Sequence, residues 1–215
     1  MIILTGGEKG GTGKTTLATN LALMRLQRDG DVLLVDADPQ PNASSWCASR
    51  DFNKITPRIL SVQKTGKDIR DDVRELSTKY RNIILDTGGR DSFELRAGLS
   101  VADVAIVPIC PSQFDLWTLA KFNDLVCEIK VVNPNLRTYI CLNQTPTNPA
   151  MKQADKAREF FERSEFEHIQ LAKTQIPFRI VYQNVATKGK TVHEAKIDNK
   201  AENELDALYE EIING

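Results

Sequence analysis

The sequence predicts an α/β fold with a doubly wound, mostly parallel sheet flanked by helices. Short apolar runs alternate with segments of helical period, and each run is continuously apolar, as expected for strands that are buried on both faces. This strand–helix–strand order favours right-handed crossovers. A glycine-rich loop follows the first run directly, and ligands of such sheets bind at the carboxyl ends of strands. The expected strands are residues 2–5, 32–35, 83–85, 104–109 and 138–142.

The segments between these runs carry apolar residues at helical spacing. In the first of them, Leu17, Leu21 and Met24 fall on one face of a helix. Residues 183–198 mix polar and apolar side chains without a clear period. The expected helices are residues 15–28, 67–79, 116–131, 150–166 and 200–213.

Length and composition indicate a single domain over residues 1–215. The chain is 41% hydrophobic, which is enough to form one sizeable core, and its net charge is -1. Any contact with nucleic acid must therefore come from a local basic patch. No apolar run approaches the ~20 residues of a membrane span. The four cysteines lie far apart and no basic leader is apparent, so we expect a reducing, cytoplasmic location.

Residues 9–16 read Lys-Gly-Gly-Thr-Gly-Lys-Thr-Thr and carry the most specific chemical signal in the chain. Glycines let successive backbone N–H groups point inward, and a helix that starts near Lys14 adds the positive end of its dipole. Lys14 is suited to the β/γ-phosphates and the Thr15 hydroxyl to Mg²⁺. The alternative is a glycine-rich turn that only joins a strand to a helix. The residues expected to bind ATP here are Gly10, Gly11, Thr12, Gly13, Lys14, Thr15 and Thr16.

The strict P-loop pattern fails at one position, because Glu8 stands where a glycine is usual, and Lys9 is an additional lysine at the start of the loop. This variant resembles the ParA/MinD group of P-loop ATPases, with their deviant Walker A motif, and the small partition ATPases most closely. The resemblance implies that Lys9 reaches across an ATP-dependent homodimer to the partner's phosphates. The alternative for Lys9 is a solvated surface lysine. No helix-turn-helix precedes the loop in this sequence.

Two carboxylates, Asp36 and Asp38, follow the second apolar run. Side chains spaced by one residue on an extended segment point to opposite faces, so the two acids are expected to have different roles. The resemblance implies that Asp36 supports the Mg²⁺ shell and that Asp38 positions the attacking water, which makes Asp38 catalytic together with Lys9 and Lys14. The alternative is an ordinary Asp-Pro turn.

A third apolar run ends in Asp86-Thr87-Gly88-Gly89. With the P-loop present, this run matches the Walker B arrangement, in which the carboxylate of Asp86 helps to hold Mg²⁺. Further along, the resemblance implies that Asn143 contacts the adenine and that the loop containing Pro177 closes over the base. Residues 189–194 resemble the family's Gly-x-x-Val segment.

Rival chemistries are disfavoured by particular residues. The two histidines have no metal-ligand spacing with cysteine, and the loop after Asp86 lacks the cysteines of a cluster-binding relative. Residues 201–215 contain five acidic residues and no Lys or Arg, which argues against docking on an anionic membrane.

The sequence therefore predicts an Mg²⁺-dependent ATPase that partitions plasmid or chromosomal DNA. The resemblance implies a dimer that binds duplex DNA without sequence preference, associates with the nucleoid and is stimulated by a ParB-like partner. The alternative function is an ATP-gated scaffold that positions a protein assembly without contacting DNA. The basic residues expected to contact DNA, or otherwise to be scattered and solvated, are Lys173, Arg179, Lys188, Lys190, Lys196 and Lys200.

Overall fold

The computed structural model describes residues 1–148 and 150–214, and within them eight strands form one sheet whose pairs are all parallel. The strand order is β3-β2-β4-β1-β5-β6-β7, and β8 also pairs with β6. This confirms the predicted doubly wound sheet. The strands are β1 (Ile2–Thr5), β2 (Leu33–Ala37), β3 (Leu60–Gln63), β4 (Ile83–Thr87), β5 (Val104–Ile109), β6 (Arg137–Thr145), β7 (Gln170–Leu171) and β8 (Ile176–Pro177).

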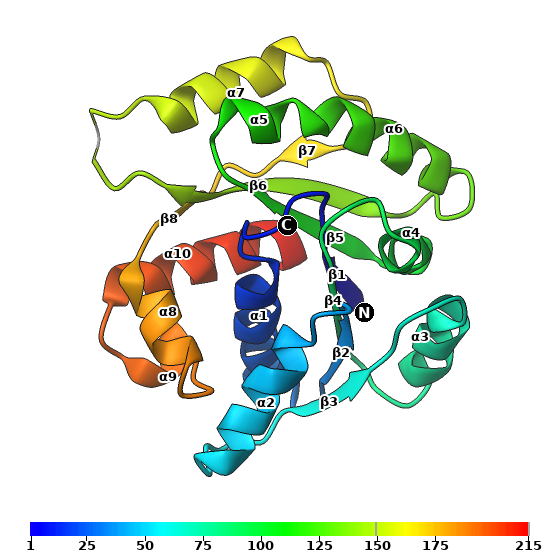
Figure 1. Cartoon of the computed structure of the whole chain (residues 1–215), viewed down its shortest axis with the longest axis vertical. Helices are drawn as coiled ribbons and strands as arrows, with labels where there is room; N and C mark the ends of the chain where they lie inside the picture. Colours follow the sequence, from blue (N-terminus) through cyan, green and yellow to red (C-terminus); the bar gives the residue numbers. More distant parts are fainter. Residues whose placement is uncertain (149, 215) are drawn as a thin grey trace.

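Helices cover both faces of the sheet (Figure 1). On one face pack α1, α2 and α8–α10, and on the other pack α3–α7. The helices are α1 (Lys14–Asp29), α2 (Asn42–Phe52), α3 (Ile69–Ser77), α4 (Phe93–Leu99), α5 (Gln113–Leu116), α6 (Thr118–Lys130), α7 (Gln153–Arg163), α8 (Ile180–Ala186), α9 (Val192–Ala195) and α10 (Asn199–Tyr209), followed by a π-helical turn η1 (Glu210–Asn214).

Successive side chains of each strand point to opposite faces of the sheet, so both faces carry apolar side chains. Ile3 of β1 packs into the core beneath α1 and α10, whereas its neighbours Ile2 and Leu4 pack into the core beneath α4 and α6. In β4, Ile84 and Leu85 divide in the same way. Because both faces are covered, the strands are continuously apolar, which explains why all five predicted strands are found.

The elements missing from the prediction are those whose sequences lack a clean pattern. The edge strand β3 is half exposed, so its side chains are not uniformly apolar. The buried face of α2 includes a charged residue, Arg50, which conceals the helical period. The short helices α4, α5, α8 and α9 and the two-residue strands β7 and β8 offer too few positions for a periodic signal.

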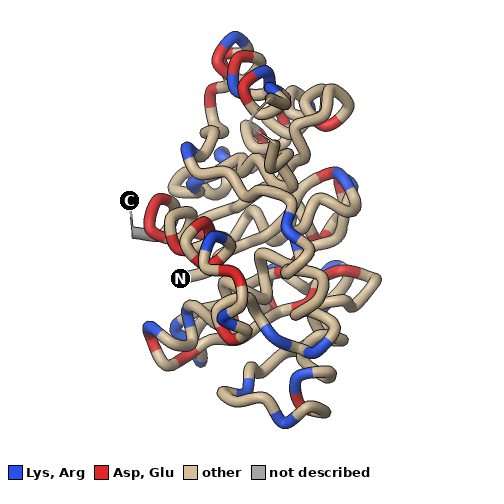
Figure 2. Tube along the Cα trace, turned by 90° about the vertical axis from the view of Figure 1, so that its left-hand side faces the viewer, with Lys and Arg blue, Asp and Glu red and all other residues tan. Residues whose placement is uncertain are grey.

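Charges of both signs are interspersed along the trace (Figure 2). This agrees with the net charge of -1. Within residues 1–148 and 150–214, none of the helices combines the length and apolar character needed to cross a bilayer.

The topology gathers the predicted motifs at one edge of the sheet. β1 lies between β4 and β5, and the chain crosses to opposite sides of β1 in its two halves, so a switch point lies at the carboxyl end of β1. The glycine-rich loop leaves β1 there. In the register of the sheet, Asp86 lies beside both Thr5 and Asp36.

Candidate nucleotide site

A cavity of about 950 Å³ opens at this carboxyl edge. The glycine-rich loop forms its floor, and the segments that follow β2 and β4 form one wall. The predicted residues that line the cavity are Lys9, Gly10, Gly11, Gly13, Lys14, Thr15, Thr16, Asp38 and Asn143. Its size is that of a typical small-molecule site.

The loop presents free backbone N–H groups to this cavity. Gly13 precedes α1 in a left-handed conformation (φ 97°), and no described side chain caps the helix. The first N–H groups of α1 therefore remain available to an anion, which the helix dipole also favours. Thr12 is buried behind the loop.

Lys14 is held within the loop by a backbone carbonyl group of the loop itself. Its Nζ donates to the carbonyl oxygen of Lys9 at 2.7 Å, and the residue is only 7% exposed. Burial lowers the pKa of Lys14, while the charges of Asp86 and Asp38 oppose that shift. The side chain is thus a positive charge fixed beside two carboxylates.

The glycine-rich loop is fastened on one side by β6. Asn143 Nδ2 donates to Thr12 O at 2.6 Å, and Gln144 Nε2 donates to Gly11 O at 2.7 Å. A Cβ on Gly13 would lie 2.3 Å from Asn143 Nδ2, so only glycine fits there. Asn143 lines the cavity, and its amide nitrogen holds the loop.

On the other side, the loop is fastened by the segment after β4. The backbone N–H of Arg90 donates to Glu8 O at 2.7 Å. A Cβ on Gly89 would lie 3.1 Å from Gly10 N, so the two loops touch backbone to backbone. The position of residues 88–90 is therefore coupled directly to that of the phosphate-binding loop.

Asp36 and Asp86 are fully buried side by side at the ends of β2 and β4. Asp36 accepts backbone N–H groups from Ser44 at 2.7 Å and Asp38 at 3.3 Å. Asp86 Oδ1 accepts the Thr5 hydroxyl at 3.1 Å, but no described residue hydrogen-bonds to Asp86 Oδ2. Burial raises the pKa of Asp86 to about 7 and the charge of Asp36 adds to the shift, while the hydroxyl groups of Thr15 and Thr5 and the charge of Lys14 oppose it.

These oxygens fit Mg²⁺ better than they fit a metal held entirely by protein. In the described part of the chain, no three His, Cys, Asp or Glu side chains converge on one point. Mg²⁺ is usually held by one or two carboxylates with waters and substrate phosphates. The unpartnered oxygen of Asp86 and the hydroxyl of Thr15 offer such a set, while Asp36 is used to order the segment from Asp38 to Ser44.

Asp38 and Lys9 lie on the wall of the cavity. Asp38 Oδ1 accepts the N–H of Gln40 at 2.8 Å, and a Cβ on Gly88 would lie 3.1 Å from that oxygen. The side chains of Asp38 and Asp36 have separate hydrogen-bond partners. Lys9 is half-buried and makes no ion pair with a described residue, so its charge is available.

The far end of the cavity contains residues that the sequence prediction missed. Pro177 lies in β8 and does not line the cavity, but the next residue, Phe178, does and is 49% exposed. Tyr182 and Gln183 of α8 complete this wall. The available signal was the aromatic residue directly after the Ile-Pro pair, since a flat ring suits a nucleobase.

The basic residues predicted to contact DNA have different surroundings. Lys188, Lys190 and Lys196 line a second pocket. Arg179 instead lines the nucleotide cavity, where it pairs with Glu204 at 2.6 Å.

Lys173 and Lys200 line neither of these two pockets. The backbone N–H of Lys173 donates to Glu211 at 2.6 Å, beside an acidic residue, and Lys200 lies in the first turn of α10. Asp198 lies between two of the predicted residues, since it pairs with Arg179 (3.8 Å) and accepts the backbone N–H of Lys200 (3.1 Å).

The chain is similar to known nucleotide-binding proteins over most of its length. A family model described as the CobQ/CobB/MinD/ParA nucleotide binding domain matches residues 3–212. The maintenance of carboxysome distribution protein A of Halothiobacillus neapolitanus is 29% identical over 212 residues, covering 95% of this chain and 93% of that protein. The chromosome partitioning protein ParA of Myxococcus xanthus is 25% identical over 209 residues, covering 78% and 74%.

The fold is also that of a solved nucleotide complex. The septum site-determining protein MinD of Pyrococcus horikoshii, solved with Mg-ADP, superposes with a TM-score of 0.72 at 17% identity, covering 97% of this chain and 94% of that one. At this identity the likeness concerns the fold alone.

The raised pKa of Asp86 gives a testable pH dependence. Its pKa moves from 3.8 to about 7 on folding, so the folded protein holds this proton more tightly than the unfolded chain does. In EDTA without nucleotide, the contribution of Asp86 to stability should be full below pH 4 and decline as pH rises to about 7, by on the order of 4 kcal/mol.

Urea unfolding at several pH values, with Asp86→Asn alongside the parent, measures this contribution. The asparagine keeps the shape but does not titrate, so the difference in unfolding free energy between the two proteins should change across this window. A difference that stays constant from pH 4 to pH 7 would show that Asp86 titrates normally.

Proposed function

This chain belongs to the CobQ/CobB/MinD/ParA nucleotide-binding family, and from that premise we propose that it is an Mg²⁺-dependent ATPase that acts as a dimerising switch in partitioning a cargo. The observation that carries the proposal is the meeting of three features in one cavity. These are the uncapped start of α1, the anchored Lys14 and the unpartnered oxygen of Asp86.

Each feature suits a different part of Mg-ATP. The N–H groups of the loop and the charge of Lys14 bind phosphate oxygens. Thr15 and Asp86 would hold Mg²⁺, which neutralises charge on the phosphates when it is bound. The aromatic wall at Phe178 would accept the base, with Pro177 behind it.

Asp38 is placed to orient the water that attacks the γ-phosphate. It lies on the cavity wall against Gly88, above the buried acids and not among them. Lys9 lies at the mouth of the cavity without a counter-ion in the described structure. We propose that it binds the phosphates of the nucleotide held by a second copy of the chain.

The two lysines should therefore give different phenotypes. We expect Lys14→Ala to lose ATP binding, since it removes the charge inside the loop. Lys9→Ala should bind ATP within a few-fold of the parent but fail to dimerise. Equilibrium titration with a labelled non-hydrolysable analogue and sedimentation in its presence measure the two effects.

Lys67→Ala, an exposed lysine outside the cavity, is the matched control and should behave as the parent in both measurements. Dimerisation of Lys9→Ala at the concentrations that suffice for the parent would contradict the cross-subunit role.

Asp38→Ala should bind ATP and dimerise but turn over at least 100-fold more slowly, because orienting water stabilises the transition state and not the ground state. Asp38→Asn, which keeps the shape, should share the defect. Phosphate release and nucleotide affinity are to be measured on the same samples. A parallel loss of affinity would make Asp38 a structural or metal-binding residue.

The cargo distinguishes two forms of the proposed function. The first is partition of plasmid or chromosomal DNA, with non-specific duplex binding in the ATP state and hydrolysis stimulated by a ParB-like protein. It is supported by the likeness to a chromosome partitioning protein. The second is ATP-gated positioning of a protein assembly, which is supported by the likeness to a carboxysome distribution protein over nearly the whole of both chains.

Retention on duplex DNA separates them. For the first form, we expect the chain to bind random-sequence duplex at least ten-fold more tightly with ATP than with ADP, and Lys14→Ala to lose the difference. Binding is to be measured by fluorescence anisotropy at fixed salt, since phosphate contacts depend on salt. Equal, negligible retention in both nucleotides would favour the scaffold.

A further inference from the structure

A second pocket of about 580 Å³ lies between the end of α2 and the segment formed by residues 187–196. Gln27, in the last turns of α1, lines it, and that residue is roughly 20 Å along the helix from Lys14. The pocket is thus separate from the nucleotide cavity. The charged and titratable residues on its wall are Lys54, Lys188, Lys190, His193, Glu194 and Lys196.

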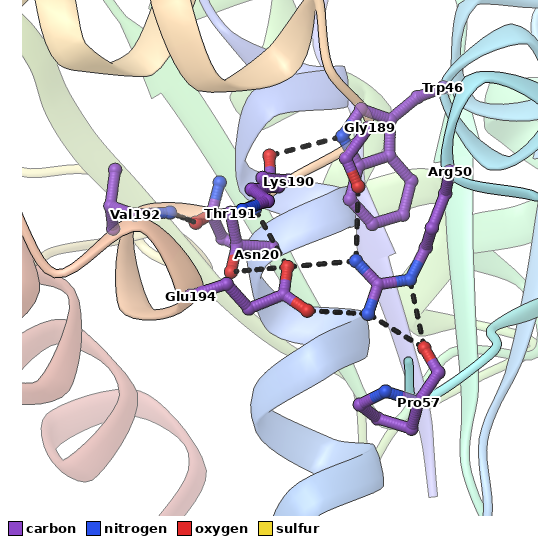
Figure 3. Close-up of polar contacts among 9 residues, drawn as sticks. All are labelled: Asn20, Trp46, Arg50, Pro57, Gly189, Lys190, Thr191, Val192 and Glu194. Carbon is purple, nitrogen blue, oxygen red and sulfur yellow. Dashed lines mark hydrogen bonds and ion pairs between the residues drawn. The ribbon is translucent and has the colours of Figure 1, made fainter. Parts of the chain in front are cut away.

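One face of α2 holds the backbone of this segment. Four side chains of the helix and its C-cap donate to four successive carbonyl groups, two of which appear in Figure 3. The contacts are Ser49 Oγ to Thr187 O (3.2 Å), Asn53 Nδ2 to Lys188 O (3.3 Å), Arg50 Nη1 to Gly189 O (3.0 Å) and Trp46 Nε1 to Lys190 O (3.3 Å).

Gly189 allows this approach. A Cβ there would lie 2.3 Å from the backbone nitrogen of Arg50, and the residue has a left-handed φ of 69°. The lysines on either side, Lys188 and Lys190, are consequently fixed by their main chain, while their side chains remain free to reach a ligand.

Arg50 is fully buried and also holds the segment through an ion pair with Glu194. Its guanidinium forms a two-pronged ion pair with Glu194 (2.5 and 2.8 Å) and also donates to Pro57 O (2.6 and 2.9 Å), as Figure 3 shows. Glu194 in turn accepts the N–H of Thr191 at 3.0 Å in a capping box, and the N–H of Val192 donates to Asn20 of α1 at 3.3 Å.

The pocket is left with uncompensated positive charge. Among the described residues that line the pocket, Glu194 is the only acidic one, and it pairs with Arg50. Among the described residues, none forms an ion pair with Lys54, Lys188, Lys190 or Lys196. Unpaired lysines around a concave surface attract a polyanion.

Two of these lysines are held in an unfavourable backbone conformation. Lys54 (φ 54°) and Lys196 (φ 51°) are left-handed, which is uncommon for residues other than glycine, Asn and Asp. Such strain concentrates at functional sites. Of the other described non-glycine residues with positive φ, Arg90 and Gln144 line the nucleotide cavity, whereas Glu165 lines neither pocket.

We propose that this second pocket binds the phosphate backbone of duplex DNA, and that the Arg50–Glu194 pair positions its lysines. The inference rests on the DNA-binding form of the proposed function and specifies where that binding occurs. It assigns contacts to Lys54, Lys188, Lys190 and Lys196, and it excludes Lys173, Arg179 and Lys200.

A salt titration of DNA binding in the ATP state tests the location. Each phosphate contact contributes about 0.9 to the slope of log K against log salt. Lys188→Gln/Lys190→Gln should flatten the slope by nearly two per chain for every duplex sequence. The matched control, Lys173→Gln/Lys200→Gln, should leave the slope unchanged. A slope altered by the control pair and not by the pocket pair would overturn the assignment while leaving the proposed function intact.

Lys54→Gly/Lys196→Gly separates binding from folding. Glycine accepts a left-handed φ, so this variant should melt at the same temperature as the parent or higher, yet bind DNA at least several-fold more weakly. Unchanged DNA affinity in this variant would remove both lysines from the site.

Glu194→Gln tests the positioning role. If Glu194 acted only through its charge, neutralising it would make the pocket more positive and tighten DNA binding. Because we infer that Glu194 holds the segment in place, we expect this variant to bind DNA several-fold more weakly. ATP affinity is to be measured on the same sample. Tighter binding would overturn the positioning role. Absence of ATP-dependent DNA binding in the parent would overturn the whole inference together with the partition form of the function.

Discussion

Two buried carboxylates, Asp36 and Asp86, impose the strongest constraint on this structure. Both are fully buried and are paired in register on β2 and β4. A buried charge is very unfavourable unless hydrogen bonds or an opposite charge compensate it. Asp36 is compensated by two backbone N–H groups, and these contacts determine the path from Asp38 to Ser44. Among the described residues, Asp86 Oδ1 accepts the Thr5 hydroxyl and Oδ2 has no hydrogen-bond partner, so burial favours the neutral form of Asp86, while the hydroxyl of Thr15 and the charge of Lys14 favour its ionised form.

The phosphate-binding loop is shaped by its neighbours as much as by its own glycines. Glu8, which departs from the usual pattern, is not among the residues with positive φ, whereas Gly7, Gly11 and Gly13 are. Glycine is therefore unnecessary at position 8, where the carbonyl group instead accepts the N–H of Arg90. Lys9 then follows with its carbonyl directed to Lys14. The residue that departs from the motif, Glu8, is thus the point at which the loop is hydrogen-bonded to the segment after β4.

Local sequence patterns predicted most of the sheet and the phosphate-binding loop, because continuous apolar runs and a glycine-rich turn are local signals. They failed where a residue's environment depends on distant partners. Arginine is mostly a surface residue, yet Arg50 is buried against Glu194, 144 residues away. Arg179 suggested a DNA contact, yet it pairs with Glu204 of α10 beside the nucleotide cavity. Neither pairing has a periodicity or motif from which a single sequence could predict it.

The same distant pairing makes α2 connect the two pockets, as α1 also does through Lys14 and Gln27. Asn42, at its first turn, lines the nucleotide cavity, and Ser44 donates to Asp36. Asn53, at its C-cap, and Arg50 hold the segment around Gly189. Breaking a buried ion pair by removing one partner typically reduces stability by about 3–5 kcal/mol, more than a few surface contacts supply. Separating the helix from the segment is correspondingly unfavourable, so a displacement of α2 at the nucleotide end would move the lysines of the second pocket with it.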